Sequence, residues 1–175
     1  MVSARLVALA LLSSAVAAAH VEQYPQRDAL TLRPSGARLV ISYAIPAGED
    51  ARTVRKAFDR DHDGTLDPGE YRALATALAE QARHFAALSV DDAAVTLRLV
   101  GTEPGPPGKD NERLVVEVTL EAKLDLTKAH RVVLEDRHKD RRIQVPITVV
   151  VEKLQLANVP QAHVSVGHPL QLDLD

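Results

Sequence analysis

Residues 59–70 form an acidic string in which a carboxylate recurs at every second position before a glycine. The string is Asp-Arg-Asp-His-Asp-Gly-Thr-Leu-Asp-Pro-Gly-Glu. Alternate side chains of a curved loop point toward its centre, and Gly64, at the sixth position, permits the sharp bend that such a loop needs. Carboxylates and backbone carbonyls are the hard oxygen ligands that Ca²⁺ takes in proteins. The string therefore predicts a loop of about twelve residues that closes around a calcium ion.

The predicted ligands differ in how they supply oxygen. Six residues are expected to contribute: Asp59, Asp61, Asp63, Thr65, Asp67 and Glu70. Thr65 offers its backbone carbonyl, and Asp67 acts directly or through a water molecule. Glu70 is long enough to chelate the ion with both carboxylate oxygens, while Gly64 serves the loop geometry alone.

Helical periodicity flanks the string on both sides. Val54 and Phe58 lie four residues apart before it. Residues 67–70, Asp-Pro-Gly-Glu, have the composition of a capping box with proline at the first helical position. An apolar stripe then follows at Tyr71, Leu74, Leu78, Ala82 and Phe85. The spacing predicts a short helix before the loop and a long helix after it.

Period-two alternation predicts strands around this helical segment. Two strands near residues 30–33 and 38–45 are expected to form a hairpin, and residues 101–111, rich in Gly and Pro, are expected to form a loop. Later strands are expected from residue 93 through Leu99 and at 114–124, 130–135, 143–153, 162–166 and 170–174. About seven or eight short strands separated by turns predict an α+β chain: an antiparallel, immunoglobulin-like β-sandwich with the helix-loop-helix inserted between strands 2 and 3.

The first 19 residues are predicted to be a signal peptide. A basic start with Arg5 precedes an apolar run over residues 6–16, and three alanines at 17–19 offer a cleavage site before His20. A membrane anchor is the alternative, but it would need about 20 apolar residues. We expect a secreted or periplasmic protein after cleavage near Ala19. The predicted domains are then the sandwich, over 20–45 and 88–175, and the insertion over 46–87.

The composition excludes several classes of function. A formal net charge of −3 is too small to favour a nucleic acid partner. The chain has no cysteine, hence no disulfide, no lipidation site and no cysteine nucleophile. Gly-x-Ser-x-Gly, His-Glu-x-x-His and phosphate-loop motifs are also absent from the sequence. We therefore expect neither catalysis nor nucleic acid binding.

His20 suggests a second metal site. Cleavage after Ala19 would make it the first mature residue, whose α-amine and imidazole could chelate Cu²⁺ or Ni²⁺. Cleavage after Ala17 would place it third, which also suits these ions. A second histidine would be needed, and His163 and His168 are the candidates. Alternatively, His20 merely follows the cleavage site.

Residues 50–87 resemble the EF-hand family of calcium-binding proteins, with Leu66 at the eighth loop position, where that family carries an aliphatic residue. EF-hands usually occur in pairs that are bridged at this position, and the sequence contains one loop. Leu66 is therefore expected either to bridge to a second copy, giving a homodimer, or to be shielded by the sandwich.

Two roles of the calcium ion are consistent with the sequence. Extracellular calcium modules commonly have dissociation constants of about 10⁻⁴–10⁻³ M, and an unpaired loop is expected to be weak. Such a site suits either constitutive structural calcium or reversible sensing. We expect an exported calcium-binding protein that acts as a structural or scaffold module of the bacterial envelope.

A broader resemblance covers about residues 19–155. Ala19-His20, the strand segments at 30–32 and 39–43, and the run from Phe58 to Tyr71 are similar to the extracytoplasmic segment of nickel/cobalt exporter-type membrane proteins. The sequence lacks the membrane helices that perform transport, so transport is not implied. The resemblance implies, as the alternative function, a periplasmic accessory protein that handles Ni, Co or Cu through His20 and meets a protein or membrane-protein partner.

Overall fold

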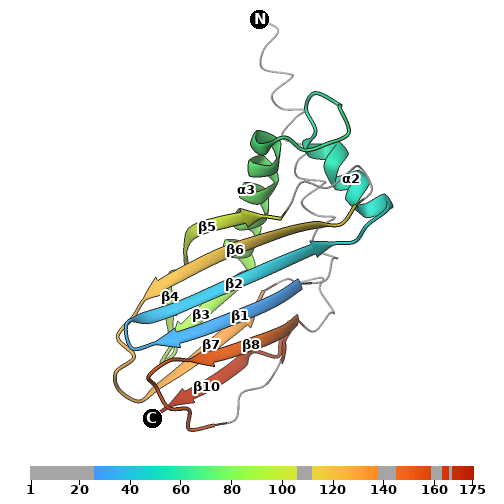
Figure 1. The fold of residues 1–175 in the computed structure, drawn as a ribbon. Coiled ribbons are helices and arrows are strands. Elements are labelled where there is room, and N and C mark those ends of the chain that lie inside the picture. The colour runs from blue at the N-terminus through green and yellow to red at the C-terminus, as the bar shows by residue number, and fades with distance from the viewer. Residues whose placement is uncertain (1–25, 106–111, 138–144, 159–162, 166) are drawn as a thin grey trace, which may run out of the picture.

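About half of the described chain is β-strand, and two helices lie between its second and third strands (Figure 1). The structure is a computed structural model that describes residues 26–105, 112–137, 145–158, 163–165 and 167–175. The first elements are β1 (Gln26–Arg33), β2 (Gly36–Ile45), α2 (Glu49–Phe58) and α3 (Pro68–Phe85). The later strands are β3 (Ala86–Val90), β4 (Ala93–Val95), β5 (Arg98–Pro104), β6 (Leu114–Lys123), β7 (His130–Asp136), β8 (Val145–Val151), β9 (His163–Val164) and β10 (Leu170–Leu174). The α+β class predicted from the sequence is confirmed.

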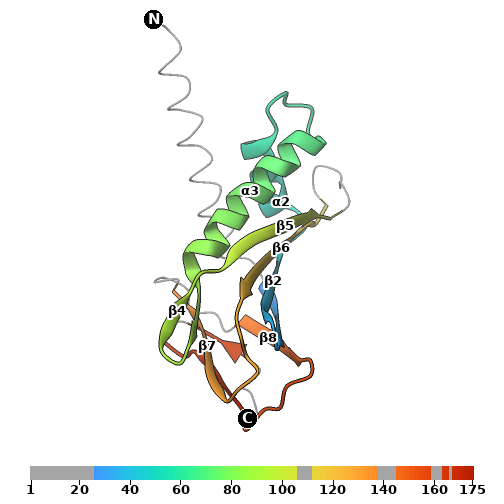
Figure 2. The ribbon, with the colours of Figure 1, turned by 90° about the vertical axis from the view of Figure 1, so that its left-hand side faces the viewer.

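The strands form two hydrogen-bonded sheets. The larger has six strands in the order β5-β6-β2-β1-β8-β9, and the smaller has four in the order β10-β7-β3-β4. The two sheets lie one behind the other in Figure 1. The helix α2 and the loop lie toward the end of the molecule away from the C terminus, and α3 runs back from the loop toward the smaller sheet (Figure 2). The loop between the helices thus projects from one end of the β-structure.

Alternation along β2 and β6 determines which side chains enter the core. Leu39, Ile41, Tyr43 and Ile45 of β2 are buried, and the residues between them are half-buried. All of β2 pairs antiparallel with β6, from Gly36 opposite Lys123 to Ile45 opposite Leu114. Because side chains of paired strands share a face, the alternating residues of β6 join the same hydrophobic cluster.

The long helix covers part of this core. Its predicted apolar stripe is buried at Tyr71, Leu74, Leu78 and Ala82, and half-buried at Phe85. The helix packs against β5 and β6, beside which it runs in Figure 2. The helix that follows the loop is therefore held against the edge of the larger sheet. No helix in the described part of the chain is both long and apolar enough to cross a membrane.

One strand pairing differs from the antiparallel arrangement predicted from the sequence. β1 pairs with β8 in parallel, from Asp28 opposite Ile147 to Leu32 opposite Val151. A parallel pair requires a long crossover connection, and here all the chain between β1 and β8 supplies it. Period-two alternation marks which face is buried but carries no information about strand direction.

The strand predicted from residue 93 through Leu99 is also divided. β4 ends at Val95 in the smaller sheet, and β5 begins at Arg98 in the larger one. β5 continues to Pro104, into the segment predicted as a loop. Glycine and proline are tolerated there because β5 is an edge strand with an irregular register after Leu99.

We expect Gly36→Ala to destabilise the protein by about 1–3 kcal/mol, because a Cβ at this position would overlap the carbonyl oxygen of Ala122 in β6. Chemical denaturation of both proteins measures the difference. Gly101→Ala in β5 is the matched control, since its Cβ would meet nothing within 4 Å. Equal losses of stability in the two variants would contradict the close approach of β2 and β6.

Candidate metal centre

The acidic loop begins where α2 ends. Asp59 is the C-terminal cap of α2, and its N–H donates to the carbonyl oxygen of Arg55 at 2.7 Å. Gly64 has a φ of 86°, in the left-handed region that glycine adopts readily. Its N–H donates back to Asp59 Oδ2 at 2.9 Å. The loop thus turns at the predicted position and returns toward its first residue.

The loop ends in the capping box predicted from residues 67–70. Asp67 Oδ1 accepts the N–H groups of Gly69 and Glu70 at 2.6 and 2.8 Å. Glu70 Oε2 accepts the N–H of Asp67 at 3.0 Å. Two backbone N–H groups of the first turn of α3, which have no partner within the helix, are satisfied in this way. The side chain of Asp67 is thereby fixed at the start of the helix.

Three of the six predicted ligands converge. Asp59, Asp61 and Asp63 each present a carboxylate oxygen within 4.8 Å of the other two. The Thr65 N–H and hydroxyl both donate to Asp63 Oδ1 at 2.7 Å. Asp61 Oδ1 accepts the N–H of Asp63 at 3.2 Å. These bonds shape the loop so that acidic oxygens point at one another, an arrangement that a cation stabilises.

The carboxylate of Asp59 shows whether the residues of the loop fit a metal ion. Its side chain is only 7% exposed, and Oδ1 is buried without a hydrogen-bond partner. A buried carboxylate oxygen without a partner is costly unless another group satisfies it. All the groups that converge here are carboxylates, the donor set that hard divalent cations such as Ca²⁺ take. The residues present therefore fit a hard divalent cation.

The titration of the acids reflects this crowding. Burial acts to raise the pKa of Asp59, but the backbone amides of Gly64 and His62 outweigh it and hold that pKa below its ordinary value. The backbone amide of Asp63 acts to lower the pKa of Asp61. Partial desolvation and the neighbouring carboxylates nevertheless raise it.

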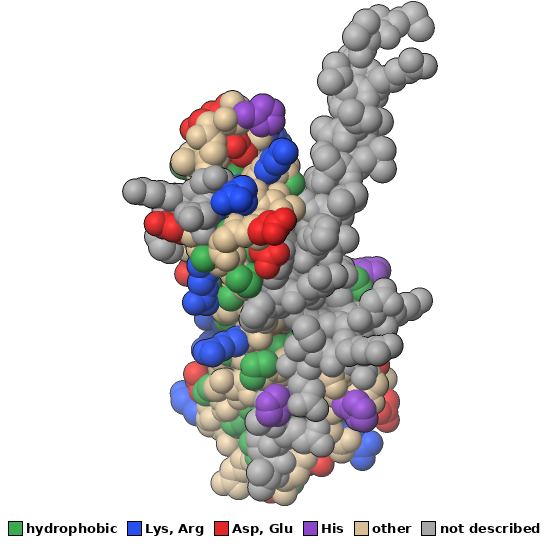
Figure 3. All heavy atoms as spheres, turned by 90° about the vertical axis from the view of Figure 1, so that its right-hand side faces the viewer, with side chains coloured by type: hydrophobic (Ala, Val, Ile, Leu, Met, Phe, Trp, Pro, Cys, Tyr) green, Lys and Arg blue, Asp and Glu red, His purple; other side chains and the backbone are tan. Residues whose placement is uncertain are grey.

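Figure 3 shows acidic and basic side chains interspersed over the helical end on one face of the molecule.

Among the described acidic residues, Asp67 and Glu70 are not part of this cluster of Asp59, Asp61 and Asp63. Both oxygens of Glu70 accept backbone N–H groups, Oε1 from Arg60 and Oε2 from Asp67. Asp67 Oδ1 caps α3, and Thr65 donates to Asp63. A carboxylate oxygen has two acceptor positions, so the buried Glu70 keeps capacity for a metal.

Sequence reasoning missed Arg55, which is 1% exposed. Its Nη1 donates to the carbonyl oxygen of Glu112 at 2.8 Å, just before β6. Arg55 falls four residues after Ala51 and three before Phe58, both of which are buried. That helical spacing places Arg55 on the buried face of α2. Arginine side chains are rarely buried, so the sequence did not suggest this position. Arg55 fastens the helix before the loop to the larger sheet.

Leu66 is 4% exposed within this single chain. It belongs to the hydrophobic core cluster together with Phe58 and Tyr71. The same side chain lines a cleft with residues of α3 and β5. The loop is therefore fixed on its apolar side by the rest of the molecule.

The predicted transition-metal site and signal peptide lie outside the described residues, since both His20 and residues 1–19 fall there. His163 lies in β9, and His168 forms an isolated bridge with Ser165. Both histidines are exposed. Neither belongs to a group of three or more metal-binding side chains among the residues that the structure describes.

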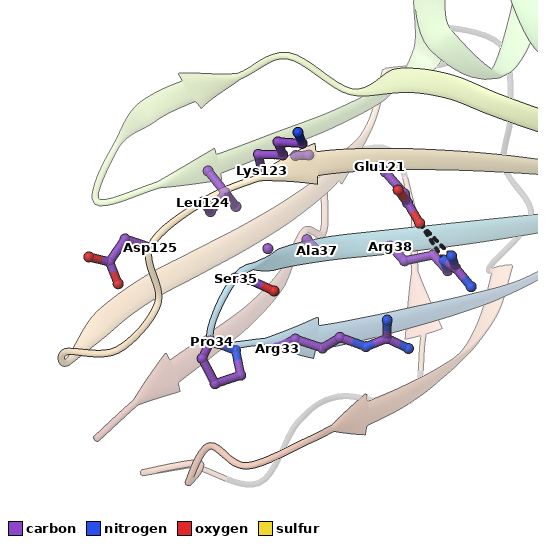
Figure 4. A pocket seen from close by; sticks show the side chains of 11 residues that line it. Arg33, Pro34, Ser35, Ala37, Arg38, Glu121, Lys123, Leu124 and Asp125 are labelled. Carbon is purple, nitrogen blue, oxygen red and sulfur yellow. Dashed lines mark hydrogen bonds and ion pairs between the residues drawn. The ribbon is translucent and has the colours of Figure 1, made fainter.

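Another hollow, of about 680 Å³, lies at the β1–β2 turn (Figure 4). Its arginines are paired with acids: Arg38 Nη2 lies 2.6 Å from Glu121 Oε1, and Arg33 Nε lies 2.9 Å from Glu152 Oε2. Lys123 and Asp125 also line this hollow, so side chains of both signs surround it. The acidic loop remains the stronger candidate.

The chain was compared with known proteins. No protein-family model matches it, and no curated protein matches it.

We expect Asp67→Ala to lower the free energy of unfolding of the metal-free protein by about 0.5–2 kcal/mol, because it removes the N-terminal cap of α3. Urea denaturation in a chelating buffer measures this. Asp67→Ser should recover most of the loss. Asp50→Ala, in the first turn of α2, is the control and should change stability by less than about 0.5 kcal/mol. Equal effects of Asp67→Ala and Asp50→Ala would contradict the capping role.

Proposed function

We propose that this chain is an exported calcium-binding protein whose residues 59–70 form a single EF-hand loop. In this proposal the two sheets form an immunoglobulin-like sandwich, and α2, the loop and α3 are an EF-hand inserted into it. The protein serves as a structural or scaffold module of the bacterial envelope. The observation that carries the proposal is the buried, unpartnered Oδ1 of Asp59 beside the carboxylates of Asp61 and Asp63.

The proposed ligands have distinct tasks. Asp59, Asp61 and Asp63 supply the converging carboxylates, and bound Ca²⁺ would supply the positive charge that offsets their repulsion. Glu70 lies in the first turn of α3, and Asp59 lies at the end of α2. A site that uses both carboxylates ties the two helices together. This link supports a structural role.

The surroundings of the loop favour a structural ion over a sensor. Leu66 and Phe58 are already buried, and Arg55 fastens α2 to the backbone before β6. A sensor needs a second arrangement with different contacts for the ion to select. Since the helix pair is packed against the sheet in the described form, we propose that calcium stabilises this form.

Calcium titration by calorimetry tests the site. We expect Glu70→Gln to weaken binding about tenfold or more, because it removes one of the charges on which the affinity of such loops depends. Glu80→Gln is the matched control: it makes the same change on an exposed turn of α3, where Glu80 pairs with Arg83. Glu80→Gln should bind calcium with the same affinity as the wild-type protein. Equal calcium heats in the unchanged protein and Glu70→Gln would refute the site assignment.

Calcium should also stabilise the fold by mass action. At a free concentration one hundred times the dissociation constant, the free energy of unfolding should rise by about 2.7 kcal/mol. Thermal or urea denaturation with and without calcium measures the change, and Glu70→Gln should show much less of it. If saturating calcium did not raise the free energy of unfolding of the wild-type protein, that result would contradict a structural role.

A further inference from the structure

Both ends of the acidic loop are fastened to the same end of one strand, β6. Before the loop, Arg55 of α2 is 1% exposed, and its Nη1 donates at 2.8 Å to the carbonyl oxygen of Glu112, just before β6 begins (Figure 1). After the loop, Tyr71 of α3 is buried, and its hydroxyl donates at 3.5 Å to the carbonyl oxygen of Val115 in β6. The two helices that flank the loop are therefore anchored to neighbouring carbonyls of one strand.

Arg55 and Tyr71 are each connected to an end of the proposed metal site. The carbonyl oxygen of Arg55 accepts the N–H of Asp59, the first loop residue, at 2.7 Å. Tyr71 directly follows Glu70, the last loop residue. Burial raises the pKa of Tyr71, and the positive charge of Arg55 acts against that rise, which places the guanidinium near the phenol. The two anchors thus lie together behind the loop.

A buried arginine behind an acidic loop has two opposite effects on a bound cation. Its positive charge repels the cation. Its hydrogen bond holds the last turn of α2, and with it the first carboxylate of the loop, and holding a ligand in place beforehand lowers the ordering cost of binding. Burial, backbone amides and neighbouring acids shift the pKa values of Asp59 and Asp61, and Arg55 is not among the main causes. The charge of Arg55 therefore acts weakly on the loop, and its positioning effect dominates.

We propose that Arg55 is a positioning residue of the calcium site: together with Tyr71 it couples the loop to the start of β6 and raises the calcium affinity. This inference rests on the proposed calcium function and adds to it the element that sets the affinity. The coupling is reciprocal, so the contacts at the start of β6 are in turn stabilised when the loop is occupied.

Calorimetric titration of the full chain with calcium chloride tests the proposal with two variants of α2. Arg55→Met removes the donor and the charge and should weaken binding about tenfold, within the usual range of coupling between two sites. Lys56→Met is the matched control: it removes the same charge at the exposed neighbouring position. Because loss of a positive charge lessens repulsion of the ion, the control should bind calcium with the same or a higher affinity.

Arg55→Lys keeps the charge and one donor for the carbonyl of Glu112, so its calcium affinity should lie between those of Arg55→Met and the wild-type protein. Urea denaturation in a chelating buffer shows that each variant is folded before titration. Wild-type or higher affinity in Arg55→Met would overturn this inference alone. If the wild-type protein itself bound no calcium, the proposed function would fail as well.

A measurement on the wild-type protein keeps the inference falsifiable if a variant does not fold. Amide hydrogen exchange is followed by NMR with and without calcium. The ion should slow exchange at residues 114–116, at the start of β6, more than in β10, which belongs to the smaller sheet. Equal slowing in the two strands would mean that calcium stabilises the molecule only as a whole, and it would contradict the coupling.

Discussion

The carboxylate of Glu70 is buried and accepts backbone N–H groups from both ends of the acidic loop, from Arg60 and from Asp67. Asp67 returns the interaction by accepting the N–H of Glu70. This exchange fixes where α3 begins and how the loop closes. The loop can therefore hold its shape through its own hydrogen bonds, and the position of its acids follows from that shape.

The closed loop concentrates like charges. Carboxylate oxygens of Asp59, Asp61 and Asp63 come within 4.8 Å of one another. Desolvation, followed by the neighbouring acids, raises the pKa of Asp61. Such crowding costs free energy unless a cation offsets it. The packing of the flanking helices keeps the acids together, because Leu66 and Phe58 are buried in the core and Arg55 donates to the carbonyl of Glu112. The proposed calcium site thus depends on hydrophobic contacts outside the loop.

The same packing produces the cleft beside the loop. The first half of α3 and the end of β5, an edge strand of the larger sheet, line this cleft from opposite sides. Leu66 and Tyr71 consequently contact the core on one side and line the cleft on the other. Arg72 lies next to Tyr71 on the exposed side of the helix. The acidic loop and the neighbouring cleft are therefore held in place by the same core contacts of Leu66 and Tyr71.

Features that depend on residues close together in the chain can be predicted from the sequence alone. The capping box needs only residues 67–70, the bend needs Gly64, and the buried face of β2 follows from alternation. These interactions are satisfied within a few residues, so composition and spacing reveal them.

Features that depend on distant partners became visible in the folded chain. The parallel pairing of β1 with β8 and the division of residues 93–104 between two sheets require neighbours far along the chain. The burial of Arg55 depends on a carbonyl at Glu112, and the unpartnered Oδ1 of Asp59 depends on how the loop closes over it. Periodicity records which face of an element is apolar; it does not record which element covers that face, because that choice is made by long-range packing.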